Sequence, residues 1–197
     1  MVKQAILDAL DDDRLRIIDF SMDGSGINRS NFSRIRDAID NGDIDVTEDN
    51  ALPAGAAASY NDNANVIGYE PGLTANDVSS SISTRAVIMH ECAHAIVDMN
   101  QHSLRVLADE AAGYIVQIMY RLIAGQSFIR TWAEENKTTP DGRIYYEAIR
   151  VVDARSMLGH CVILRSGDHC EKLMKAVQEH PVYAGTRMDA YSRCNGI

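Results

Sequence analysis

The stretch from Ser83 to Met99, STRAVIMHECAHAIVDM, has the clearest helical pattern in the chain. Its apolar residues recur at intervals of three or four, as they do along the buried face of a helix. They are Val87, Ile88, Cys92, Ala95, Ile96 and Met99. We therefore expect a long helix that packs into the protein core, and the rest of the fold can be built outward from it.

Two histidines within this helix are spaced for binding one metal ion. His90 and His94 stand four residues apart, so their side chains project about 40° apart, one turn above each other. Glu91 projects about 100° from His90, where a carboxylate can reach a metal-bound water without displacing it. Cys92 is directed away from both histidines and into the core. The alternative interpretation is a pair of buried histidines and a helix-surface glutamate that bind no metal.

A short hairpin precedes this helix and a second long helix follows it. The segments 57–60 and 65–69 flank Asn61-Asp62-Asn63-Ala64, a pattern typical of a β-hairpin. Residues 100–103 form a tight connection to an apolar helix over 104–124, which ends at Gly125. The two long helices are expected to form the centre of the protein.

Helices dominate the flanking segments as well. One is expected over 2–10 and another over 30–39, capped by Ser30 and closed at Asn41-Gly42, with a loop at Asp23-Gly24-Ser25-Gly26 between them. Three more are expected over 127–136, 144–158 and 168–179, and the segment from Val182 has little regular pattern. The sequence thus predicts an α+β fold that is mostly helical. A chain of 197 residues, 46% of them hydrophobic, suits a single domain over 1–197.

Composition excludes two classes of partner. Lysine and arginine total 19 against 28 for aspartate and glutamate, so the net charge of −9 repels phosphate backbones, and no nucleic acid is expected as a partner. No membrane association is expected either, because no apolar run approaches the roughly 18–20 residues that span a bilayer. The start of the chain, interrupted by Asp8 and Asp11, is unlike a signal peptide. The expected location is cytoplasmic by default, with delivery into another cell as an effector left open. Four cysteines without CxxC spacing indicate mostly reduced thiols, and a Cys161–Cys170 bridge is the alternative.

The string HECAHAIVD, residues 90–98, resembles the HExxHxxxD active-site helix of the thermolysin-like enzymes, in the gluzincin branch of the zincin superfamily of zinc metallopeptidases. The resemblance covers about residues 56–125, and it leaves 1–55 and 126–197 unassigned. It implies that His90 and His94 bind Zn²⁺ together with a glutamate on the next helix. It also implies that Glu91 is the general base that takes a proton from the zinc-bound water.

The resemblance also bears on the substrate-binding strand and on the branch of the superfamily. The strand over 65–69 would correspond to the sheet edge along which an extended substrate pairs in zincins, and the alternative is an ordinary member of the sheet. The metzincin branch is excluded, because Val97 and Asn100 stand where that branch has a glycine and a third histidine.

Two acidic residues at the start of the second helix are candidates for the third metal ligand. Asp109 and Glu110 begin 15 residues after His94, and the small residues Ala111-Ala112-Gly113 would let the two helices approach closely. Glu110 resembles the gluzincin ligand and is favoured. Asp109 is the alternative, because the spacing is shorter than in the thermolysin-like enzymes, and the residue that is not a ligand is a charge favoured at a helix start.

Other polar residues have open roles. Asp98, one turn after His94, either orients that imidazole through its second nitrogen or is a solvent-exposed helix-end residue or a partner of Arg105. His102 is an alternative metal donor or a surface histidine. Related enzymes stabilise the oxyanion of the reaction with a histidine or tyrosine. Tyr114, one turn after Glu110, is the first candidate for this role, and nothing in the sequence selects it over the remaining candidates: His160, His169, His180, Tyr183 and Tyr191.

The resemblance and the motif together predict a zinc metallopeptidase that hydrolyses peptide bonds of a protein or peptide substrate. In this interpretation His90, His94 and Glu110 hold Zn²⁺ and Glu91 is the base. One alternative is a zincin-like binding module without turnover, against which Glu91 argues, since a structural site needs no base. The other is a zinc-dependent amidase or deformylase on a small substrate, for which the accompanying glycine-rich and cysteine-containing motifs are missing.

Overall fold

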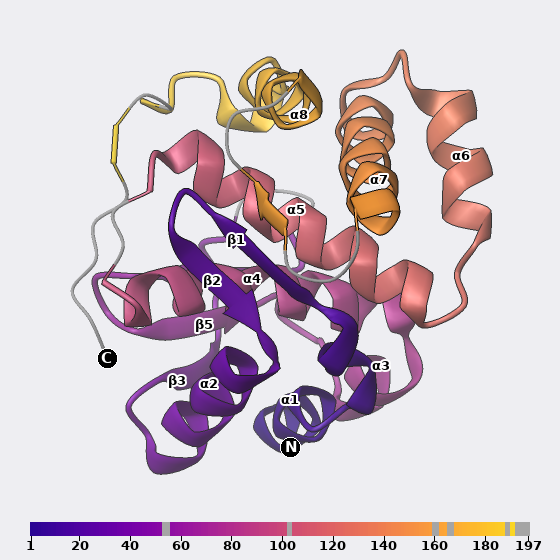
Figure 1. Ribbon diagram of the computed structural model, residues 1–197. Helices are drawn as coiled ribbons and strands as arrows, with labels where there is room; N and C mark the ends of the chain where they lie inside the picture. The colour runs from indigo at the N-terminus through magenta and orange to yellow at the C-terminus, as the bar shows by residue number, and fades with distance from the viewer. Residues whose placement is uncertain (53–55, 102–103, 159–161, 165–167, 188–189, 192–197) are drawn as a thin grey trace.

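Two long helices, α4 (Ile82–Met99) and α5 (Val106–Ile123), pack against each other at the centre of the protein (Figure 1). The computed structural model describes residues 1–52, 56–101, 104–158, 162–164, 168–187 and 190–191. Helix α4 begins at its cap Ser81, whose side chain accepts a hydrogen bond from the backbone of Thr84. Most of α4 from Ala86 onward is buried. The central helix pair expected from the apolar pattern is therefore confirmed.

A three-stranded sheet lies beside α4 and has the order β3-β5-β4. Strands β4 (Ala58–Asn61) and β5 (Val66–Tyr69) form the expected antiparallel hairpin, in which Tyr60 lies opposite Ile67. Strand β3 (Asp45–Glu48) pairs with β5 in parallel on its other side. The expectation that 65–69 forms a sheet edge is therefore wrong: β5 is the central strand, and the edge next to α4 is β4.

A second small sheet has the order β2-β1-β6. Strands β1 (Asp19–Met22) and β2 (Ser25–Asn28) form a tight hairpin, and β6 (Val162–Leu164) pairs with β1 in parallel. Asp23 and Gly24 at the turn both have positive φ, as a type I′ hairpin turn requires. The sequence placed the turn correctly but read Ser25 and Gly26 as part of a loop.

The remaining helices surround the central pair (Figure 1). They are α1 (Val2–Leu10), α2 (Arg29–Asn41), α3 (Ala75–Ser80), α6 (Phe128–Asn136), α7 (Pro140–Leu158), α8 (Asp168–Gln178) and the short 3₁₀ helices η1 (Asp13–Ile17) and η2 (Pro181–Tyr183). The predicted α+β fold with mostly helical content is confirmed. Helix α2 is capped by Asn28 rather than by Ser30, and it closes at Gly42, whose φ is +86°. Helix α3, begun by a capping box of Thr74 and Asp77, was missed.

One hydrophobic core joins the N-terminal, central and C-terminal helices. Within the described residues, no helix is both long enough and apolar enough to cross a membrane. Cys92 and Cys170 are buried free thiols, and burial raises the pKa of Cys170 to about 11. The other two cysteines lie outside the described residues.

Asp12 ties the N-terminal segment to the central helices. Its carboxylate accepts hydrogen bonds from the backbone and guanidinium of Arg14 and from the hydroxyl of Tyr120 on α5, 2.8 Å away. The guanidinium of Arg85 on α4 lies 3.9 Å from it. Burial raises the pKa of Asp12, but these hydrogen bonds and Arg14 outweigh it, so the net pKa is lowered.

We expect Asp12→Ala to lower the free energy of unfolding by about 1–3 kcal/mol at neutral pH, because it leaves the Tyr120 hydroxyl without its acceptor. The part of this stabilisation that comes from the lowered pKa of Asp12 is present above the unfolded pKa of about 3.9 and is lost as pH falls through the folded pKa. Urea denaturation at pH 7 and pH 3 measures it, with exposed Asp13→Ala as the control. An equal loss at both pH values would contradict the argument.

Candidate metal centre

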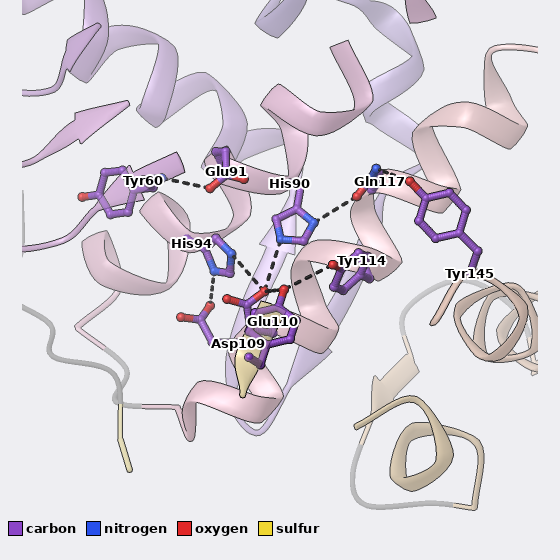
Figure 2. Close-up of polar contacts among 10 residues, drawn as sticks. Tyr60, His90, Glu91, His94, Asp109, Glu110, Tyr114, Gln117 and Tyr145 are labelled. Carbon is purple, nitrogen blue, oxygen red and sulfur yellow. Dashed lines mark hydrogen bonds and ion pairs between the residues drawn. The ribbon is translucent and has the colours of Figure 1, made fainter. Parts of the chain in front are cut away.

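His90 and His94 occupy the face of α4 that is turned toward α5 (Figure 2). Their ring centroids lie 4.9 Å apart, as the four-residue spacing on one helix predicts. His90 is only 6% exposed, and His94 is partly buried. Cys92, between them, is fully buried on the core side and takes no part in the cluster, as expected.

Glu110 comes from the first turns of α5 and meets both imidazoles. Its Oε2 lies 3.6 Å from Nε2 of His90 and 4.0 Å from Nε2 of His94. These three side chains form a group that could hold a metal ion, with their ligand atoms within 4.8 Å of one another. Asp109, the alternative third ligand, instead contacts the other nitrogen of His94. The structure thus brings together the three residues favoured from the sequence.

The outward-facing nitrogens of both imidazoles have fixed partners. Nδ1 of His90 lies 3.1 Å from the side-chain oxygen of Gln117, and Nδ1 of His94 lies 2.8 Å from Oδ1 of Asp109. Both partners are hydrogen-bond acceptors, so in the neutral imidazoles Nδ1 carries the proton and Nε2 carries the lone pair. Gln117 is held in this orientation because its amide nitrogen donates to the hydroxyl of Tyr145. These contacts direct both Nε2 lone pairs toward Glu110.

This donor set fits a cation. Two imidazole lone pairs and a carboxylate oxygen converge, and acceptors that face one another repel unless a positive charge lies between them. Two histidines and a glutamate are also a combination found in catalytic zinc sites, where three protein ligands leave a position open. The chemistry of the described side chains therefore suits a bound metal ion.

In the absence of a metal ion, the residues of this centre shift one another's pKa values. Burial raises the pKa of Glu110, but the nearby imidazoles of His90 and His94 and the hydrogen bond from the Tyr183 hydroxyl outweigh that effect and lower it to about 2. Burial likewise lowers the pKa of His94, and Asp109, Glu110 and Glu91 together raise it to about 10. The centre thus has a strongly negative field that favours bound positive charge.

Glu91 is a buried carboxylate beside the two histidines, 9% exposed. Burial raises its pKa, an effect that the neighbouring histidines oppose and Glu110 reinforces. Its Oε2 accepts a hydrogen bond of 2.9 Å from the backbone N–H of Tyr60 on the edge strand β4 (Figure 2). A raised pKa and a fixed orientation are the properties that a general base near neutral pH requires.

Two tyrosines complete the surroundings of Glu110. The hydroxyl of Tyr183, on η2, donates to Oε2 of Glu110 over 2.6 Å, and Tyr114 lies 3.2 Å from the same hydroxyl. Because the Tyr183 proton is committed to the carboxylate, Tyr114 is the donor in the second bond. The ring of Tyr114 also packs edge-on against His90 with centroids 4.7 Å apart. Burial raises the pKa of both tyrosines, so both remain protonated donors.

The other candidates from the sequence lie elsewhere or have other contacts. His180 contacts Asp141 on α7, His169 lies on α8, and Tyr191 is an exposed residue that pairs with Arg105 through the backbone. His102 and His160 lie outside the described residues.

Asp98 does not orient His94, which was one of the roles considered for it. It is 2% exposed, so the solvent-exposed alternative is wrong, and its carboxylate accepts a hydrogen bond from the hydroxyl of Tyr60. The carboxylate that orients His94 is Asp109. Asp98 instead links α4 to β4, the strand that also contacts Glu91.

Sequence reasoning missed Tyr60 and Gln117. Tyr60 acts through its backbone N–H, which carries no residue-specific signal. Gln117 had a detectable signal, because it follows Glu110 by seven residues and therefore lies on the same face of α5.

Comparisons of this chain with protein-family models, with curated proteins and with solved structures find no significant match. A function is therefore inferred from the geometry of the candidate metal centre.

Proposed function

We propose that this chain is a zinc-dependent metallopeptidase in which His90, His94 and Glu110 hold the metal and Glu91 is the general base. The observation that carries the proposal is the convergence of two oriented Nε2 lone pairs and one carboxylate oxygen beside a second, buried carboxylate. A metal site that served structure alone would have no use for Glu91. The proposal includes the resemblance of this chain to the gluzincins.

Each side chain has a separate task in the proposed reaction. A bound zinc ion would supply Lewis acidity for the substrate carbonyl and lower the pKa of a water molecule at the open position. Glu91 accepts the proton of the attacking water and passes it to the leaving amine, and the N–H of Tyr60 holds its carboxylate in place. Gln117 and Asp109 keep the imidazoles in the tautomer that binds metal.

The position of β4 favours an extended peptide as substrate. Among the described strands, β4 pairs only with β5, so its other edge lies toward α4 and the metal centre. The N–H of Tyr60 points from that edge to Glu91. A peptide that lies along this edge, pairing with backbone groups of β4 other than the Tyr60 N–H, would pass directly beside the general base.

The experiment that tests the proposal is metal content combined with peptide hydrolysis. Wild-type protein equilibrated with zinc and then desalted should retain about one zinc per chain, and a mixed peptide library should be cleaved until a chelator is added. Glu110→Ala should retain far less zinc. Asp109→Ala, which changes the neighbouring carboxylate, should lower zinc affinity by only about 10–100-fold.

The outcomes separate the parts of the proposal. Equal zinc retention by wild type and Glu110→Ala would remove Glu110 from the ligand set. Stronger zinc loss in Asp109→Ala than in Glu110→Ala would assign the third ligand to Asp109. One bound zinc with no cleavage of any library peptide would favour a binding module.

A further inference from the structure

A separate pocket lies between the end of α5 and the helices α6 and α7. It has a volume of about 300 Å³ and is lined by Arg121, Phe128, Ile129, Trp132, Asp141 and Tyr145. None of these residues belongs to the metal-binding group. A volume of this size is at the lower end of the range for small-molecule sites.

The pocket walls are aromatic. The rings of Trp132 and Tyr145 lie 5.4 Å apart at an angle of 61°, and Ile129 between the helices is almost fully buried. Phe128 is 58% exposed at the start of α6, although an aromatic side chain loses favourable free energy when it remains in water. An aromatic ring inserted here would cover Phe128 and stack against Trp132.

The pocket also contains two opposite charges that do not pair with each other. Arg121 stacks its guanidinium over the ring of Tyr145 at 5.6 Å and donates through Nε to the neutral side chain of Gln126. It forms no ion pair with any residue in the described part of the chain. Asp141 contacts His180 through Oδ1, and its side chain is 77% exposed. A ligand that carries both an anion and a cation would satisfy both residues.

The pocket is separated from the metal centre by buried side chains. Gln117, which lies between Tyr145 and His90, is 5% exposed, and Tyr114 beside it is largely buried. A peptide bound at the metal centre could not reach Arg121 along this face of α5 without displacing them. A ligand bound in this pocket would therefore be separate from a peptide bound at the metal centre.

We propose that this pocket binds a free aromatic amino acid. The ring would cover Phe128 and pack against Trp132, the carboxylate would pair with Arg121, and the ammonium group would pair with Asp141. The binding site goes beyond the proposed hydrolase activity and does not depend on it.

The chain contains a single tryptophan, Trp132, which makes the pocket directly observable. Titration with phenylalanine, which barely absorbs where tryptophan is excited, should give a saturable change in Trp132 fluorescence. Phenylalaninamide, without the carboxylate, and N-acetylphenylalanine, without the ammonium group, should each bind at least about tenfold more weakly. Arg121→Gln should weaken phenylalanine binding to the same degree.

Two controls locate the ligand. Arg130→Gln changes an arginine of α6 that pairs with Asp153 outside the pocket, and it should bind phenylalanine as wild type does. Metal-free Glu110→Ala should also bind phenylalanine normally. Because amino acids can chelate zinc, binding that requires the metal would place phenylalanine at the metal centre and overturn the proposal.

Two other results would also overturn it. One is the absence of a saturable change up to about 10 mM phenylalanine. The other is equal affinity for phenylalanine, its amide and its acetyl derivative, which would show that the charges of Arg121 and Asp141 do not recognise the ligand.

Discussion

Glu91→Gln is expected to bind zinc with wild-type affinity and to hydrolyse peptide substrates about 10²–10⁴ times more slowly. Glutamine has nearly the same shape as glutamate, and its side-chain oxygen can still accept the hydrogen bond from the N–H of Tyr60. It cannot accept a proton from water near neutral pH. The substitution therefore removes the chemistry of the base and leaves the three metal-binding side chains unchanged.

The measurement is the hydrolysis rate at equal zinc occupancy, with the zinc content of each sample determined alongside. Glu147→Gln is a matched control, because Glu147 is another largely buried glutamate, on α7, and it pairs with Arg150 outside the metal centre. It should retain wild-type activity. Undiminished hydrolysis by Glu91→Gln would remove Glu91 from the mechanism even if zinc binding is established.

Gly113→Ala is expected to displace His90, one of the proposed zinc ligands. Zinc affinity should therefore fall by more than the roughly 10–100-fold that follows when a side chain that only orients a ligand is lost. A Cβ at Gly113 would lie 2.5 Å from Nε2 of His90 and under 3 Å from two of its ring carbons. The imidazole cannot yield easily, because Gln117 holds its Nδ1 and Tyr114 packs against the ring. Either His90 leaves the centre or α4 and α5 move apart.

At a helix position where the added Cβ met no neighbour, the same substitution would stabilise the helix by about 1 kcal/mol, since alanine is a better helix former than glycine. Overpacking between α4 and α5 is expected to cost about 1–3 kcal/mol, so the metal-free protein should be equally or less stable. Isothermal titration with zinc and thermal unfolding of the metal-free protein measure the two effects. Gly26→Ala is the control, because its nearest atom lies at 3.8 Å, an ordinary contact. Wild-type zinc affinity in Gly113→Ala would show that His90 is not a ligand.

The parts of the centre that the sequence predicted are those set by local helix geometry. The four-residue spacing of His90 and His94 fixes their common face on any helix. Glu110 and Asp109 were both found near the start of the next apolar helix, and Glu110 was favoured because it resembles the gluzincin ligand. The structure separates the two residues by the direction in which each side chain points. That direction depends on how α5 packs, which a single sequence does not encode in a readable pattern.

The parts that were missed depend on distant segments or weak local patterns. Strand β3 is largely exposed and contains Asp45 and Glu48, so nothing in its sequence suggested the pairing that makes β5 the central strand. Strand β2 includes Gly26, a residue that strands disfavour. The six-residue helix α3 is too short and too polar to show periodicity.

The hydrogen bond from Tyr183 to Glu110 joins residues 73 positions apart. During synthesis both long helices leave the ribosome well before Tyr183 does, so the growing chain holds its two histidines and Glu110 without the tyrosine that fixes the carboxylate. The final geometry of the centre is therefore reached only after the segment around η2 has been made and has folded back onto α5. A newly made chain would thus acquire its full affinity for metal late in its own assembly.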